Sequence, residues 1–176
     1  ENRRYVARLG NGGDLESVYD KRLGRELLFG PARLEFQHER PVAWPAWNMD
    51  WEDRRRPPEG FVEGVAEVAV TERGTARVAV RVRRRARGSE FVQTFRLAGG
   101  DAGERLEVVT EVNWRGRACS LKWAFPFTAE NQWAAYYNGL NTERRQTNHK
   151  HCFEMPSAGW IDLTDAGGAF GVSILD

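Results

Sequence analysis

The amino-acid sequence predicts an all-β fold, a large antiparallel β-sandwich formed by a single domain over residues 1–176. Short runs of alternating apolar and polar residues follow one another along most of the chain, and glycine-rich turns separate them. No segment keeps a 3.6-residue apolar period over three helical turns. The runs number about a dozen, and because an open sheet of that many strands tends to curl or split, we expect two packed sheets.

The first expected strands flank a turn that contains Gly10, Gly12 and Gly13. They alternate as a strand with one buried face does. The expected strands in this part of the chain are residues 5–9, 15–20, 25–29 and 34–38. A loop rich in proline and tryptophan is expected at residues 39–60.

The clearest hairpin is expected between residues 61–72 and 76–85, with its turn centred on Gly74. Valines alternate with glutamates in the first run and with arginines in the second. The expected register places Val70, Val68 and Ala66 opposite Val78, Val80 and Val82, and Glu67 and Glu63 opposite Arg81 and Arg85. Opposite charges across an antiparallel pair contribute about 0.2–1 kcal/mol each, and a one-residue slip would expose the valines.

The remaining strands follow the same alternation, and Arg115-Gly116-Arg117 forms a turn among them. Their expected ranges are residues 90–97, 105–114, 120–127, 133–138, 152–155, 160–163 and 169–175.

Charge and composition exclude several classes of partner. The chain has 26 Lys and Arg residues against 25 Asp and Glu residues, whereas nucleic-acid binders usually carry a large basic excess. No apolar run approaches the ~20 residues of a membrane span, so we expect no nucleic-acid and no membrane partner. No signal peptide is visible, which predicts a cytoplasmic location. The chain begins with Glu1 and ends in an expected strand, so we expect it to be cut from a longer multidomain polypeptide.

Metal-binding and catalytic patterns are weak within the chain. Cys119 and Cys152 fit no zinc-site spacing, and a disulfide between them cannot be deduced from the sequence. His149 and His151 would share one face of a strand as half of a metal site, but no third ligand is evident and we expect a surface role. Carboxylates near turns and strand ends show no pairing that indicates glycosidase chemistry: Asp14, Asp20, Asp50, Glu52, Asp53, Glu143, Glu154, Asp162 and Asp165. We therefore assign no metal ligand and no catalytic residue here.

The basic run at residues 81–87 has two interpretations. Arginines at this density bind phosphate backbones in some proteins. We expect instead the solvated face of a strand, paired with Glu63 and Glu67.

Two segments carry side chains suited to sugars. The loop at residues 42–51 holds Trp44, Trp47 and Trp51; exposed tryptophan faces stack on the apolar face of a pyranose, and Trp47 is our candidate sugar contact. Because tryptophan buries much area, we expect most of these rings to close one end of the core. Residues 136–150 form an expected polar loop, with Asn138, Arg144, Arg145 and Asn148 as candidate donors to sugar hydroxyls.

Six motifs in order carry a family resemblance. They are Asp14-Leu-Glu-Ser-Val-Tyr-Asp-Lys-Arg-Leu-Gly-Arg-Glu-Leu-Leu28, Pro45-Ala-Trp-Asn-Met-Asp-Trp51, Leu121-Lys-Trp-Ala-Phe-Pro126, Arg145-Gln-Thr-Asn148, Phe153-Glu-Met-Pro156 with Trp160-Ile-Asp-Leu163, and Phe170-Gly-Val-Ser-Ile-Leu175. In this order and spacing they resemble the C-terminal β domain of glycoside hydrolase family 38, the α-mannosidases. Gln146 stands where the family has proline, and the doublet Arg144-Arg145 leaves open which arginine matches.

The resemblance implies a supersandwich of the galactose-mutarotase type, within a zinc-dependent retaining enzyme that cleaves α-mannosides. In that family the metal ligands, the nucleophile and the acid lie in an N-terminal α/β domain outside this chain. The resemblance thus implies that the chain is inactive alone, packs on that catalytic domain, and lends polar groups near Arg145 to the sugar cleft.

Two alternative functions stay open. One is a stand-alone carbohydrate-binding module that uses Trp44, Trp47 or Trp51 as its platform. The other is a mutarotase-like sugar isomerase, which needs its own acid and base, a glutamate and either His149 or His151.

Overall fold

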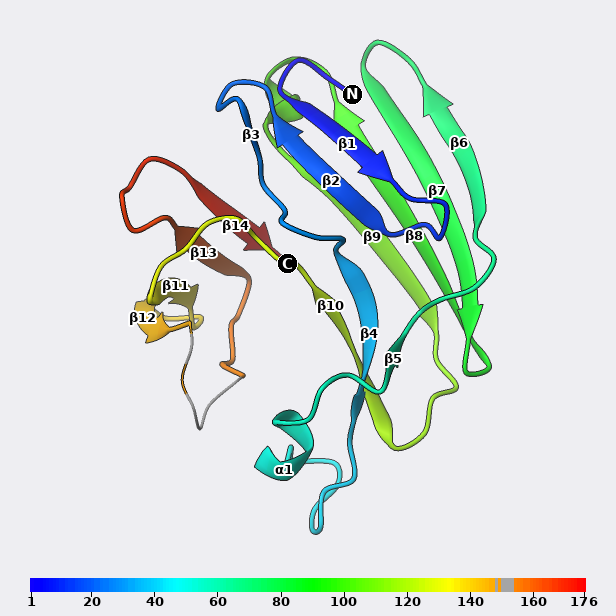
Figure 1. Ribbon diagram of the computed structural model, residues 1–176, viewed down its shortest axis with the longest axis vertical. Helices are drawn as coiled ribbons and strands as arrows, with labels where there is room; N and C mark the ends of the chain where they lie inside the picture. Colours follow the sequence, from blue (N-terminus) through cyan, green and yellow to red (C-terminus); the bar gives the residue numbers. More distant parts are fainter. Residues whose placement is uncertain (148, 150–153) are drawn as a thin grey trace.

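A computed structural model describes residues 1–147, 149 and 154–176 as a chain of short strands with little helix (Figure 1). The candidate residues Asn148, His151 and Cys152 lie outside the described residues. The strands are β1 (Tyr5–Leu9), β2 (Leu15–Asp20), β3 (Arg25–Glu26), β4 (Arg33–His38), β5 (Gly60–Phe61), β6 (Glu67–Arg73), β7 (Arg77–Ala86), β8 (Ser89–Ala98), β9 (Leu106–Asn113), β10 (Cys119–Ala124), β11 (Trp133–Tyr137), β12 (Thr142–Gln146), β13 (Trp160–Thr164) and β14 (Gly171–Leu175). A four-residue helix α1 (Trp51–Arg54) and a 3-10 turn η1 (Gly100–Glu104) complete the described elements.

The strands form antiparallel sheets that pack face to face, which confirms the predicted fold class. Sheet β6-β7-β8-β9 makes one layer, and sheets β1-β2-β3 and β10-β4-β5 lie against it (Figure 1). The fourth sheet has the order β12-β11-β13-β14 and lies on the opposite side of the molecule from β6.

The core lies between the two layers. Phe91, Phe95 and Leu97 alternate along β8 and are buried, and their face meets residues of both opposing sheets. Val18 of β2 belongs to one buried cluster and Phe36 of β4 to the other. Each fully buried side chain of this size contributes about 1.5–3 kcal/mol, so the alternation that predicted the strands also supplies the cohesion of the layers.

The expected hairpin forms, but its register was predicted wrongly. Val70 lies opposite Val80, not Val78, and Glu67 lies opposite Arg83, not Arg81. Arg73 already lies opposite Val78 beside the turn, three residues from the expected register, and an irregularity between Val70 and Glu72 then reduces this shift by one residue. The net shift of two residues near Val70 keeps valine opposite valine, which is why the sequence pattern alone did not reveal it.

The run at residues 61–72 is not one strand. Its beginning, β5, pairs with β4 in one layer, and its end, β6, pairs with β7 in the other. Gly64 lies between them with φ 128°, a conformation that favours glycine. Because β6 is an edge strand that the opposing layer covers incompletely, Val68 and Val70 are about half exposed, against our expectation of a buried face.

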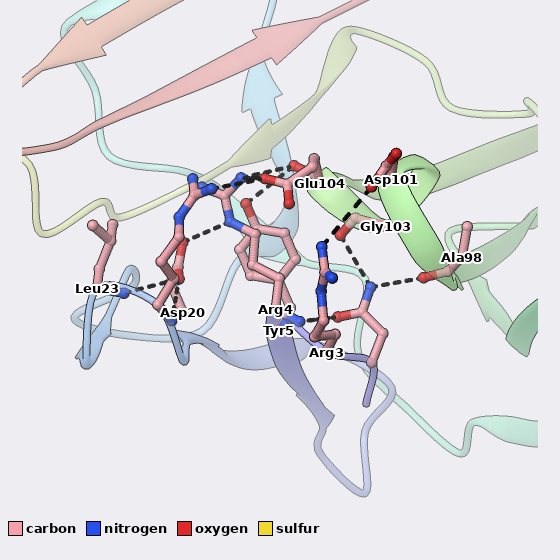
Figure 2. A network of polar contacts seen from close by, with 11 residues as sticks. Arg3, Arg4, Tyr5, Asp20, Leu23, Ala98, Asp101, Gly103 and Glu104 are labelled. Atoms are coloured by element: carbon pink, nitrogen blue, oxygen red, sulfur yellow. Dashed lines mark hydrogen bonds and ion pairs between the residues drawn. The ribbon is translucent and has the colours of Figure 1, made fainter.

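Asp20 anchors the N-terminal strand through the network in Figure 2. Its fully buried carboxylate accepts hydrogen bonds from Arg4 Nε at 3.0 Å and from the backbone N–H groups of Arg22 and Leu23 at 2.9 and 3.1 Å. Burial alone would raise the pKa of Asp20, but the N–H of Leu23, the Arg4 guanidinium and the N–H of Arg22 together hold it below its ordinary value. Arg4 also contacts Glu104, the last residue of η1, which lies a hundred positions further along the chain.

Glu26 plays a similar part at the end of β3. Its carboxylate accepts from the Ser17 hydroxyl at 2.5 Å and from the N–H groups of Val18 at 2.7 Å and Leu28 at 3.2 Å. Burial opposes ionisation, yet these donors lower the pKa of Glu26. The polar residues of the first motif are therefore bonded within the fold itself.

Arg84 is buried in the sandwich, with 2% of its surface exposed. It lies opposite Phe91 in the β7–β8 ladder and on the same face as Val82, so it points between the layers. Its guanidinium donates to Asp14 Oδ1 at 2.5 Å, to the Val62 carbonyl at 3.1 Å and to Gln93 Oε1 at 2.6 Å. The solvated-face interpretation of residues 81–87 is therefore wrong for Arg84.

The other arginines of the run do face outward. Arg83 and Arg85 contact Glu90 at 2.6 and 3.1 Å, and Arg87 contacts Glu59 at 2.8 Å. Glu67 lies 3.8 Å from Arg83, as one of the expected partners. These ion pairs favour the solvated strand face over a phosphate site.

Candidate functional site

The polar segment around Arg145 is more ordered than predicted. Residues 142–146 were expected in a loop, but they form β12, which pairs with β11 across a turn at residues 138–141. Because β12 is the edge strand of its sheet, charged residues are tolerated on it and discourage pairing with other chains. Residues 154 and 155, which we expected at the end of another strand, are not in a strand.

Asn138 builds the turn of this hairpin. Its Oδ1 accepts from the N–H groups of Leu140 and Asn141 at 3.0 and 2.8 Å, the local bonding that favours asparagine in turns. Its amide nitrogen donates to Glu143. Both ends of the amide are thus engaged within the hairpin, so its described role is to position Glu143.

Arg145 is held in one orientation by three contacts. Its Nε and Nη2 donate to Glu143 Oε2 at 3.1 and 2.8 Å, its Nη1 donates to the Pro156 carbonyl, and its guanidinium lies 5.3 Å from the centre of the Tyr136 ring. The hydrogen bonds from Arg145 first, and then from Asn138, lower the pKa of Glu143. Glu143 therefore stays ionised and fixes the arginine.

Arg144 points to the opposite face of β12, because successive side chains of a strand alternate. It is exposed and lies 5.9 Å from the centre of the Trp133 ring. The structure therefore brings Arg145, and not Arg144, together with Asn138. Sequence alternation signals this separation of the doublet, but only once the segment is known to be a strand.

The tryptophan-rich loop at residues 42–51 is largely exposed, which corrects the expectation that its rings close the core. Trp47 has 88% and Trp44 has 72% of its surface exposed. Trp51 lies at the start of α1 and is partly buried. The two exposed rings are therefore available to a ligand or a partner.

Helix α1 ties this loop to the segment that holds Arg145. The side chain of Arg54 is buried and donates to Glu39 Oε2 at 2.9 Å and to Ser120 Oγ at 3.1 Å, and its Nε lies 3.4 Å from Glu154 Oε1. Lys122 also contacts Glu154. Glu154 lies two residues before Pro156, whose carbonyl accepts the hydrogen bond from Arg145. A short series of polar contacts therefore joins the loop to the β11–β12 hairpin.

Burial changes the ionisation of Lys122 in the cluster that it forms with Arg54 and Glu154. It lowers the pKa of Lys122, and the nearby positive charge of Arg54 lowers it further. Glu154 lies against both cations, and a carboxylate in that position offsets their repulsion. The cluster is thus a charge-balanced support under the loop.

Each of the carboxylates singled out from the sequence contacts a described residue. Seven contact side-chain partners: Asp14 with Arg33 and Arg84, Asp20 with Arg4, Glu52 with Arg55, Asp53 with His38, Glu143 with Arg145, Glu154 with Arg54, and Asp162 with Ser173. Asp50, Asp53 and Asp165 accept from backbone N–H groups. Among residues 1–147, 149 and 154–176, no three His, Cys, Asp or Glu side chains come together as a metal site. No helix of the described part is long and apolar enough to span a membrane.

Comparison with known proteins gives a family and a fold. Residues 1–176 match the model of the family described as "Glycosyl hydrolases family 38 C-terminal domain". The chain is similar in structure to an alpha-mannosidase from Enterococcus faecalis V583, with a TM-score of 0.69 and 12% identity over 94% of this chain. The match spans 22% of that longer chain. A search of curated proteins found no match.

Proposed function

Because the chain belongs to the C-terminal domain family of the family 38 glycosyl hydrolases, we propose that it serves as the β-sandwich domain of an α-mannosidase and forms one wall of its sugar cleft. The observation that carries the proposal is the family match over the full 176 residues. The fold supports it, since the sandwich resembles part of a solved alpha-mannosidase chain.

The proposal assigns the chemical step to another part of the enzyme. We assign the zinc implied by the family resemblance to the catalytic domain, which is where that family holds its metal ligands. The carboxylates named above are engaged in contacts within the sandwich, which favours supporting roles for them. The contribution of this chain is to hold polar groups at the edge of the cleft.

Arg145 is the side chain best placed for that contribution. Three of the five N–H donors of its guanidinium bond to Glu143 and Pro156, and the others make no hydrogen bond to a described residue. A fixed arginine with N–H groups to spare donates to a sugar hydroxyl at little cost in side-chain entropy. Asn138 would act through Glu143 as a positioning residue.

The intact polypeptide is expected to hydrolyse an aryl α-mannoside in the presence of zinc, whereas this chain alone is expected to show no turnover. The measurement is release of the aryl group by both proteins at equal molar concentration. Turnover by this chain alone would refute the proposed division of labour, and an intact enzyme that cleaves only other glycosides would refute the substrate.

Arg145→Ala in the intact enzyme is expected to lower kcat/KM for the mannoside about 10- to 100-fold, because a hydrogen bond to a charged group contributes about 1.5–3 kcal/mol. Arg144→Ala is the matched control, since its side chain lies on the other face of β12, and a change of less than about twofold is expected. Thermal unfolding of both variants separates loss of contact from loss of structure. Equal losses of activity in the two variants would refute the proposal that Arg145 contacts the sugar.

A further inference from the structure

Four exposed apolar side chains gather on the loop at residues 42–49, which we call the aromatic loop. Val42 has 96%, Trp44 72%, Trp47 88% and Met49 58% of its surface exposed. Backbone hydrogen bonds from the N–H groups of Trp47 and Asn48 to the Trp44 carbonyl, at 2.8 and 2.9 Å, fold the loop into a tight turn that carries both tryptophans. Isolated exposed apolar residues need no explanation, but several on one short segment indicate an interaction site.

The loop is built to keep its shape. Asp50 Oδ2 accepts from the Val42 N–H at 2.8 Å and closes the loop, and Trp44 is held at φ 54°, a strained value for a tryptophan. At its base, the buried Asp53 carboxylate accepts from the Arg40 N–H at 2.6 Å. Buried Arg54 adds the charged contacts described above. A surface that is ordered in advance binds its partner with a smaller entropy cost.

The chemistry of the loop favours a protein surface over a sugar. Sugar recognition needs hydrogen-bonding groups beside the stacking ring, but the polar side chains next to the rings already bond to the backbone of the loop itself. The Asn48 amide donates to the Ala43 carbonyl at 2.9 Å, and the Asp50 carboxylate is engaged with Val42. The exposed set mixes tryptophan with valine and methionine, and tryptophan and methionine are enriched where proteins meet.

We infer that the aromatic loop is the docking surface for the catalytic domain of the same polypeptide, an inference that rests on the proposed function. Two observations identify this occupant. The solved alpha-mannosidase chain extends far beyond the 22% that this chain matches. The base of the loop is also joined to the proposed cleft: Arg54 contacts Glu154, and two residues later the Pro156 carbonyl accepts a hydrogen bond from Arg145. We therefore expect a domain that faces the cleft to meet the loop as well. Trp47 then serves the domain interface and not the sugar.

Hydroxyl-radical footprinting of the intact polypeptide tests the inference without any substitution, because tryptophan and methionine side chains are readily oxidised. Oxidation of Trp44, Trp47 and Met49 is expected to be at least tenfold slower in the native enzyme than after unfolding in urea. Native rates equal to the unfolded rates would overturn the docking surface. Protection that appears only after a mannose oligosaccharide is added would identify a sugar platform and would also overturn it.

The double variant Trp44→Ala/Trp47→Ala provides the second measurement. In the intact enzyme it is expected to split a single thermal transition into two, or to lower the midpoint of the first by at least 5 °C, and to reduce mannosidase activity at least tenfold. Val65→Ala is the matched control, because Val65 is an exposed apolar residue outside the loop (93% exposed), and we expect it to change neither. If the intact enzyme hydrolyses the mannoside and the double variant changes neither its unfolding nor its activity, the docking surface is refuted and the proposed function stands. If footprinting shows a protected loop but the intact polypeptide has no mannosidase activity, the proposed function is refuted and the docking surface stands.

Discussion

Arg84→Ala is expected to lower the free energy of unfolding by about 3–5 kcal/mol, because it removes one partner of a buried ion pair. Asp14 would keep its contact with Arg33, but the Val62 carbonyl and Gln93 Oε1 would lose their donor inside the sandwich. Each buried acceptor left without a partner costs about 1–3 kcal/mol. The measurement is urea denaturation of the chain, extrapolated to water.

Two further variants define the cause of that loss. Arg84→Met fills much of the same volume without donating hydrogen bonds, so a loss of at least about 2 kcal/mol is expected from the unpaired groups alone. Arg81→Ala removes an exposed arginine from the other face of the same strand, and a change within about 0.5 kcal/mol is expected. If Arg84→Ala proves as mild as Arg81→Ala, the buried network does not stabilise the fold.

Asp20→Ala is expected to cost about 3–5 kcal/mol by the same reasoning, since it leaves the Nε–H of Arg4 and two backbone N–H groups of the following turn without their acceptor. Asp101→Ala is the control, because Asp101 is exposed and lies 3.9 Å from Arg3, a geometry that contributes little. A loss below about 1 kcal/mol for Asp20→Ala would show that the N-terminal strand is held by packing and not by this carboxylate.

The pH dependence of stability gives an independent readout of Asp20. Its pKa in the folded state is lowered, so the folded state holds its proton less tightly than the unfolded state, in which the pKa is about 3.9. Its stabilising contribution is therefore complete above about pH 5 and disappears as the pH falls through the folded pKa. Asp20→Asn is expected to be less stable at pH 7 and to lose less stability than the parent protein on acidification. A parallel acid response in both proteins would contradict the assignment.

The sequence was sufficient for the fold class and for most strands. The valines and phenylalanines of β7 and β8 alternate so regularly that their inner face could be read directly, and Phe91, Phe95 and Leu97 are buried as expected. It was not sufficient where one local pattern fits two arrangements. A shift of two residues preserves alternation, so the register found at Val70 fits the sequence pattern as well as the expected register does.

The candidate site was harder to predict than the fold. In a basic run, the sequence does not distinguish an arginine that points into the core from one that points to solvent. The two differ only in which face of the strand they occupy and whether the other layer covers that face, and Arg84 was missed for that reason. Trp44 and Trp47 were expected in the core because of their size, but a rigid loop held by Asp50, Asp53 and Arg54 keeps the rings outside. Arg54 is held in turn by Ser120 and Glu154, which lie far from the loop in the chain, and such supports cannot be found from the local sequence.

The joining of distant segments in the core sets an order for folding. Tyr5 and Phe170 belong to the same buried cluster, and Arg25 lies over the Phe170 ring, 3.6 Å from its centre. The first strand therefore cannot complete its contacts until nearly the whole domain has left the ribosome, on the order of ten seconds or more after Tyr5 at ordinary rates of synthesis. Folding rates fall as contacting residues lie further apart in the chain, so the newly made domain would depend on protection from aggregation during that interval.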